Sequence, residues 1–447
     1  MLTKTIKWIL IFCIISSACK VNEDCHHMYD CVSDKCEHKN LMPISYYDAL
    51  GAICVASVSA LANASGLGGG PLMTIILIVV FNFKVEEAVP LSQITVFSGT
   101  LIGTLMRLHL RHPTREKPAI DYELLVVVIT PLLLGTTSGV FLSMIFPVWA
   151  TLSLLTLVLV WITFEAARAS MKSYTLENKE KTLVLKSSIN SEEQYNITYV
   201  SSDRIAKPLQ QILKSDKMCA PPLLTTLLVF IYGYNVLISL MRGSKYFHSI
   251  IDVPFCSAEY WVFTGSTAGF SLFLTLLIAI YLNRRCRKKI NVGYHFDDCD
   301  MIWNFLPCFI CVIVSIMAGI AAGLLSIGGG IIMSPIMYKL GLRTEVIVPT
   351  SSVLYVLTSS LAAILYVISG HINYYYALWV AGSAFIGSII GIVGIKVLVN
   401  KYKRSSLMVI SMTMLLALCT IIVPTYGIIE YTVNSSRDDT KSYCPEE

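Results

Sequence analysis

The chain has 447 residues, of which 55% are apolar and 14% are charged, and its formal net charge is +5. Soluble domains carry about 25% charged residues, so this composition excludes an ordinary soluble protein. It predicts a polytopic membrane protein whose surroundings are the lipid bilayer. The small positive charge lies mostly in loops, where it biases membrane orientation, and we expect no nucleic-acid partner.

The first 18 residues have the composition of a secretory signal peptide. Lys4 and Lys7 precede a short apolar run at residues 8–15, and the small residues 16–18 follow as a cleavage signature. Removal of residues 1–18 leaves the N-terminus of the mature chain outside the cytosol. We therefore expect an integral membrane protein of the secretory route, in the plasma membrane or an endomembrane.

Residues 19–45 form a polar segment that is rich in cysteine. In an oxidising lumen, closely spaced cysteines predict two disulfides whose pairing stays open among three possibilities; the candidates are Cys19, Cys25, Cys31 and Cys36. A zinc site with His26, His27 or His38 is the alternative. The oxidising compartment favours disulfides, so we predict no bound metal.

The rest of the chain contains twelve apolar elements, which predict an all-α membrane protein with about ten to twelve transmembrane or re-entrant helices. Most elements have the length that crosses the hydrocarbon core. Two of them are short, and whether these cross fully or form re-entrant hairpins stays open. The elements cover residues 46–66, 70–84, 88–106, 122–143, 147–167, 221–241, 259–283, 301–326, 331–341, 347–369, 374–398 and 406–425.

Basic loops give these elements a consistent orientation. Lys and Arg are in excess at 107–117, 168–220, 284–289 and 401–404. An N-terminus outside the cytosol followed by three crossings puts the first of these loops in the cytosol, and the others then fall on the same side.

This orientation assigns the segments between the helices. We expect a cytosolic linker at 169–220 that offers a surface for a protein partner, and a cytosolic basic loop at 284–300. The tail at 426–447 is expected outside the cytosol, where Asn434 begins a glycosylation sequon.

Two glycine triplets recur at an offset of about 260 residues; they are Gly68, Gly69 and Gly70, and Gly328, Gly329 and Gly330. A Pro–Ser element follows each triplet at a similar distance, beginning at Pro90 and at Pro349. Residues 46–168 and 301–425 thus form a repeat, with 221–283 as an inserted helix pair. The predicted topology approaches the triplets from opposite sides, so we expect inverted repeats with a substrate site near the middle of the membrane.

Glycine triplets in membrane helices allow two structures. One is close packing or a kink, because glycine lets backbones approach. The other is a break in the helix, whose new N-terminus carries about half a positive charge and holds an anion with backbone N–H groups. Two triplets, each followed by a short apolar element, favour the break.

The Pro–Ser elements add polar side chains to the same region. Pro90 and Pro349 are expected in the first turn of a helix, where the missing N–H costs nothing. The polar side chains behind them either cap a helix, donate to a bound oxyanion or bond between helices. We predict that they line the substrate site together with the triplets; they are Ser92, Gln93, Thr350, Ser351 and Ser352.

The predicted spans hold no central pair of Asp or Glu, and no Lys or Arg well inside. The charged residues near the predicted cytosolic ends are accounted for by snorkelling; they are Arg107, Glu165, Arg168 and Lys396. A neutral, donor-rich site suits an anion better than a metal ion. The chain also has no nucleophile motif, phosphate loop or dinucleotide fingerprint, so we expect neither an enzyme nor a cofactor.

The second triplet lies in the sequence AGLLSIGGGIIMSP at residues 322–335, and the first lies in a degenerate version at 65–74. Together with the downstream VPLSQ and VPTSS, these elements resemble the TauE/SafE family of membrane proteins over roughly 46–168 and 301–425. The resemblance implies a permease that exports sulfite or organosulfonates. By position it implies that the two triplets, Pro90, Ser92, Pro349 and Ser351 belong to the site.

Two functions of different classes follow from the sequence. The first is a secondary transporter of small anions, above all a sulfur oxyanion, that works by alternating access between the repeats. The alternative is a membrane receptor or scaffold that uses residues 19–45 to bind a ligand or partner. That segment is small, and a passive scaffold gives no reason for the repeat, so we expect a transporter.

Overall fold

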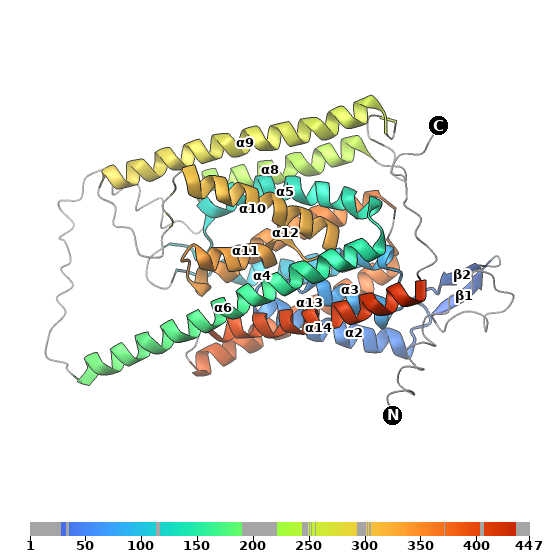
Figure 1. The fold of residues 1–447 in the computed structure, drawn as a ribbon, viewed down its shortest axis with the longest axis horizontal. Coiled ribbons are helices and arrows are strands. Elements are labelled where there is room, and N and C mark those ends of the chain that lie inside the picture. Colours follow the sequence, from blue (N-terminus) through green and yellow to red (C-terminus); the bar gives the residue numbers. More distant parts are fainter. Residues whose placement is uncertain are drawn as a thin grey trace.

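The computed structural model describes residues 28–434, apart from gaps at 33–34, 113–116, 190–220, 244–248, 250, 252, 255, 293–300, 302, 304, 371 and 403–405. The predicted signal peptide, Cys19 and Cys25 lie outside the described residues. Within the described part the chain is almost entirely helical (Figure 1). Nine of its helices there are long and apolar enough to cross a membrane, which confirms an all-α polytopic membrane protein.

The membrane helices form two sets that are separated in the sequence by α8 (Pro222–Arg242) and α9 (Ala258–Asn291). The first set consists of α2 (Tyr46–Ala64), α3 (Gly70–Val79), α4 (Val85–Arg107), α5 (Tyr122–Ile145) and α6 (Val148–Ile189). The second set consists of α10 (Phe305–Leu325), α11 (Gly329–Lys339), α12 (Thr344–Ile368), α13 (Tyr374–Tyr402) and α14 (Ser406–Asn434). In Figure 1, α8 and α9 lie along one edge of the bundle, next to α5.

Pro90 and Pro349 do not lie where the sequence analysis expected them. α4 begins at Val85 and α12 at Thr344, so each proline lies inside its helix rather than in the first turn. Acidic residues in the first turns, such as Glu345, favour the earlier starts because they interact well with the helix dipole. The prediction was wrong because it began each helix at the apolar run. Both prolines instead remove a backbone hydrogen bond inside a helix.

α6 extends further than the predicted spans. The segment 169–189, which was expected to belong to a linker, continues the helix to Ile189. It is rich in Leu, Glu and Lys, which are good helix formers, and this explains the difference. The remainder of the predicted linker, 190–220, lies outside the described residues. α14 likewise runs to Asn434, into the predicted tail.

Glycines bring helices of the two sets into direct backbone contact. α5 packs on α10, and α2 packs on α13. A Cβ built on Gly139 of α5 would lie 2.2 Å from Ile320 O, and one on Gly391 of α13 would lie 1.9 Å from Ala60 O. Small residues allow this close approach in membrane helices. Because α4 also packs on α12 and α6 on α14, the two sets interlock.

The N-terminal segment folds back onto the helices as a β-hairpin. Strands β1 (Tyr29–Val32) and β2 (Lys35–His38) pair antiparallel, and Cys31 is disulfide-bonded. The Tyr29 hydroxyl donates to Asn82 O at 2.8 Å, and His38 Nε2 lies 2.8 Å from Phe81 O. The His38 ring, one candidate ligand of the alternative zinc site, is therefore used to dock the hairpin behind α3.

A buried ion pair completes this contact. Lys39 Nζ lies 2.8 Å from Asp48 Oδ2, and the Asp48 side chain is fully buried at the start of α2. The Tyr376 hydroxyl donates to the other carboxylate oxygen at 3.2 Å. The hairpin is thus tied to α2 and α13 at once.

We expect Asp48→Asn to loosen the docked hairpin. Lys39 would keep its charge, with a side chain only 14% exposed, and lose its partner. The loss should be roughly 2 kcal/mol, below the range for fully buried pairs, and thermal unfolding in micelles measures it. Adding Lys39→Met should recover most of the stability. An unchanged unfolding temperature for Asp48→Asn would contradict the assigned role of the pair.

Candidate functional site

Both predicted glycine triplets lie where a helix is interrupted. The chain leaves the helical conformation between α2 and α3, and again between α10 and α11. The backbone φ is 72° at Gly68, 73° at Gly69 and 74° at Gly328. These values lie in the left-handed region that glycine adopts readily and other residues avoid. The triplets therefore break their helices, and the two interruptions are called here the first break (residues 65–69) and the second break (residues 326–328).

The short helices that follow the breaks, α3 and α11, run back toward the side on which α2 and α10 begin. A Cβ built on Gly51, near the start of α2, would lie 2.4 Å from the ring of Phe81, which follows α3. In the other set, Ser315 of α10 lies 3.9 Å from the sulfur of Met333 of α11. α3 has 10 residues and α11 has 11, so each spans about 15 Å, half of the hydrocarbon thickness. Of the two open alternatives, the short length of α3 and α11 favours the hairpins.

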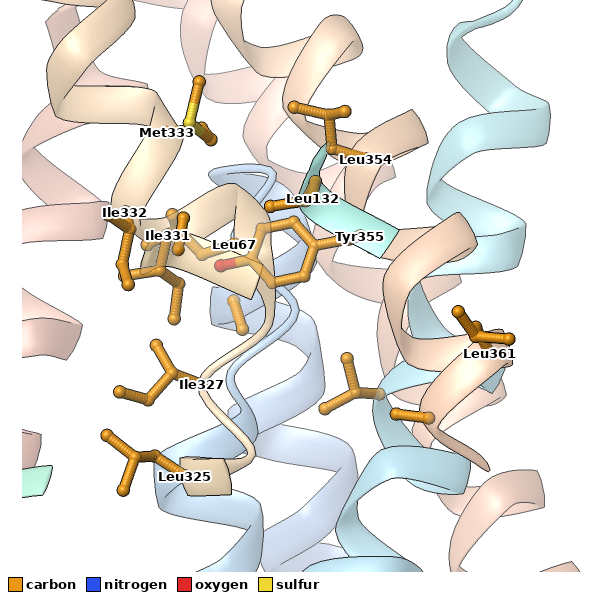
Figure 2. Close-up of a cluster of buried hydrophobic side chains, with 14 of the residues drawn as sticks. Leu67, Leu132, Leu325, Ile327, Ile331, Ile332, Met333, Leu354, Tyr355 and Leu361 are labelled. Atoms are coloured by element: carbon orange, nitrogen blue, oxygen red, sulfur yellow. The ribbon is translucent and has the colours of Figure 1, made fainter. Parts of the chain in front are cut away.

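The two breaks lie against each other in the interior of the protein. Figure 2 shows the loop through Leu67 beside the loop through Ile327. Both side chains are fully buried. A Cβ built on Gly70 would lie 1.8 Å from Ser326 O. Any larger residue at this position must push the breaks apart.

The serines of the Pro–Ser elements reach across to the opposite break. Ser92 of α4 shares a hydrogen bond with the hydroxyl of Ser326 in the second break. Ser351 of α12 donates to the carbonyl oxygen of Gly66 in the first break at 3.3 Å. Both serines also donate to a carbonyl of their own helix. Each set therefore supplies a hydroxyl to the break of the other set.

The other predicted polar residues divide into two groups. Gln93 Nε2 donates to Ala322 O at 3.0 Å, so it reaches the last turn of α10 just before the second break. Thr350 behaves differently, because its hydroxyl accepts the backbone N–H of Asp121 at 3.1 Å. Thr350 thus contacts the start of α5 and does not join the other residues at the breaks.

Tyr355 is a site residue that the sequence analysis missed. Its ring fills the space between the triplets: a Cβ built on Gly328 would lie 2.2 Å from the ring, and one on Gly330 would lie 2.3 Å from it. The side chain is fully buried, and its hydroxyl points toward the start of α11 (Figure 2). That hydroxyl faces the backbone of Ile331 but makes no hydrogen bond of normal geometry with any described residue. Its position one helical turn after Ser351 was the available signal.

Arg107 also differs from the expectation. Snorkelling was predicted to carry its side chain to the membrane surface, yet the residue is only 6% exposed. Its guanidinium folds back and donates to the carbonyl oxygens of Asn63 and Ala64, at the end of α2. A second nitrogen donates to Ser352 Oγ at 3.2 Å. The prediction was wrong because position near a helix end does not fix the direction of a long side chain.

A polar cavity of about 100 Å³ lies at the end of the bundle where α5 begins. Glu123 forms ion pairs there with Lys289 at 3.0 Å and with Arg285 at 3.4 Å. Burial, and then the negative charge of Glu123, raise the pKa of Asp121. Basic residues outnumber acidic ones in the lining, whose charged or titratable members are His112, Lys117, Asp121, Tyr122, Glu123, Arg285, Lys289 and Arg343. Through Asp121 and Thr350, this cavity borders the Pro–Ser element of α12.

A helical membrane protein with two broken helices that meet in its interior has the architecture of a secondary transporter. Comparison with known families agrees with this class. The family model described as "Sulfite exporter TauE/SafE" matches residues 3–187 and 260–420. The chain belongs to this family.

Curated relatives match over most of the chain. "Sulfite exporter TauE/SafE family protein 1" of Arabidopsis thaliana is 25% identical, over 87% of this chain and 86% of its own length. "Sulfite exporter TauE/SafE family protein 2" of the same plant is 26% identical, over 83% and 81% respectively. No solved structure matches.

Gly70→Ala is expected to destabilise the protein by about 1–3 kcal/mol, because the added methyl group overpacks the contact between the breaks. Thermal unfolding in micelles measures the effect. Gly233→Ala is the matched control, since nothing lies within 4 Å of a Cβ at that helical position. Equal unfolding temperatures for the two variants would contradict the close approach.

Proposed function

We propose that this protein exports small sulfur oxyanions, sulfite or organosulfonates, by alternating access around a site at the two breaks. The main observation behind the proposal is a reciprocal pair of hydrogen bonds, in which the serine of each Pro–Ser element bonds to the break of the opposite set. The relatives named as sulfite exporters supply the substrate class. The site consists of the triplets, Ser92, Gln93 and Ser351, with Tyr355 between them.

Alternating access is supported by the way in which the helices pair. The first helix of one set packs on the fourth of the other, in both directions: α2 on α13 and α10 on α5. The third helices pack on each other, and so do the fifth. A two-fold relation between the sets produces this reciprocal pattern. Inverted repeats with such an axis carry their substrate site between the repeats.

The chemistry at the breaks suits an anion. α3 and α11 both begin at the breaks, so their N-termini bring partial positive charge and backbone N–H donors into the interior. The hydroxyls of Ser92 and Ser351 lie at the same breaks and add donors when an anion replaces the carbonyl oxygens to which they now donate. A small tetrahedral or pyramidal oxyanion offers several acceptor oxygens to such a donor set.

Export follows from the membrane potential. An inside-negative potential contributes about 2.3 kcal/mol per charge per 100 mV to the outward movement of an anion. The charge imbalance of the polar cavity between α5, α9 and α12 attracts anions toward the bundle. With the predicted orientation, this cavity faces the cytosol and serves as the entrance.

The receptor alternative has less support. A ligand-binding module needs free side chains, whereas Tyr29, His38 and Lys39 of the N-terminal segment contact the helical bundle. These contacts favour a structural cap over the outer ends of α2 and α13.

Flux measurements in liposomes test the proposed site. Ser351→Ala and Gly329→Leu should abolish counterflow of labelled sulfite, by removal of the donor to the first break and by overpacking against Leu132, which lies 2.8 Å from a Cβ built on Gly329. Ser383→Ala is the control, because Ser383 donates only to Trp379 O of its own helix. Normal sulfite flux in both site variants would contradict the assigned site. Wild-type protein that transports neither sulfite nor an organosulfonate would contradict the proposed substrate class.

A further inference from the structure

Arg107 places a positive charge inside the bundle without a negative partner. The residue is 6% exposed, and within the described part of the chain its hydrogen bonds go to neutral oxygens, those of Asn63, Ala64, Gly103 and Ser352. No carboxylate of the described residues forms an ion pair with it. A buried charge in a membrane protein is costly unless it is paired, and such residues mark ion pathways.

The Arg107 guanidinium lies at the C-terminal end of α2, where it changes the sign of the electrostatic potential at the first break. A broken helix presents two ends to its break: the carbonyl end of α2, which is negative, and the N–H end of α3, which is positive. Without a further charge, the partial charges of these two helix ends cancel. Arg107 covers the carbonyls of Asn63 and Ala64 and so outweighs the negative end. The first break is therefore electropositive as a whole.

The second break has the same contact without the charge. The offset that relates Pro90 to Pro349 is 259 residues, and it relates Arg107 to Tyr366. The offset of 260 between the triplets relates Asn63 to Gly323. The Tyr366 hydroxyl donates to Gly323 O at 3.0 Å, just as Arg107 donates to Asn63 O. A neutral phenol thus takes the place of the guanidinium in the second set.

We propose that Arg107 makes the first break the charged half of the substrate site, so that the anion binds with its charge toward this break and carries a single negative charge. The inference rests on the proposed anion transport and deepens it. One fixed cation neutralises one charge, so a monoanion such as an alkanesulfonate or hydrogen sulfite leaves the loaded site neutral. A dianion such as sulfate leaves an unpaired charge in the interior. Arg107 acts as a specificity-determining residue through its charge.

Binding of labelled sulfite to purified protein, with methanesulfonate and sulfate as competitors, tests this assignment. In wild-type protein, methanesulfonate should compete at least tenfold better than sulfate. Arg107→Gln should weaken sulfite binding at least tenfold, which is about 1.4 kcal/mol. Arg107→Lys keeps the charge and should stay within threefold of wild type, although it loses the planar guanidinium, whose Nη2 covers the two carbonyls.

Tyr366→Phe is the matched control, since it removes the equivalent carbonyl contact in the second set without a change of charge. Its sulfite affinity should stay within threefold of wild type.

Equal sulfite affinity of wild type and Arg107→Gln would overturn the inference and leave the proposed function standing. A tenfold loss in Arg107→Lys or Tyr366→Phe would also overturn it, because the contact and not the charge would then matter. Should Arg107→Gln fail to fold, Arg107→Lys and the competition with sulfate decide the question. Wild-type protein that binds no sulfite and no methanesulfonate would overturn the proposed function itself.

Discussion

The two breaks touch in the interior of the bundle, and their contact positions both short helices. Gly70 and the carbonyl of Ser326 approach so closely that no side chain fits between them. This contact fixes where α3 and α11 begin, and therefore where their N–H groups converge. The paired helices outside, α2 with α13 and α5 with α10, hold the breaks in the interior by their own backbone contacts. A transport cycle that moves one set against the other must break and re-form the hydrogen bonds that Ser92 of α4 and Ser351 of α12 make with the opposite breaks.

The family match and the packing agree on which parts of the chain surround the site. The family model covers both helix sets and leaves out residues 188–259, which include α8. α8 packs on α5, α9 and α12, and Tyr232 donates to Ser360 of α12 at 2.8 Å. It thus lies at the edge of the bundle (Figure 1), where an additional helix leaves the breaks unchanged. The relatives match at about a quarter identity over most of their length.

The sequence predicted the helical class and both breaks, because glycine triplets and apolar runs act through local backbone preferences. It did not predict side chains whose role depends on direction. Arg107 lies at a helix end, where snorkelling is the usual outcome, but its side chain turns inward to carbonyls of α2. Tyr355 resembled any apolar residue of α12 until its ring was seen between the triplets (Figure 2). Thr350 belonged to the predicted site by its neighbours in sequence, whereas the helical rotation turns it to α5.

We expect an oxyanion to bind beside the contact of the two breaks, where Ser92 and Ser351 lie. Locating a bromine-labelled alkanesulfonate by anomalous scattering in crystals of the full chain tests it most directly. We expect one peak within reach of Ser92 and Ser351, on the side of the first break. A peak confined to the basic cavity by Asp121, or none at concentrations that saturate transport, would contradict it.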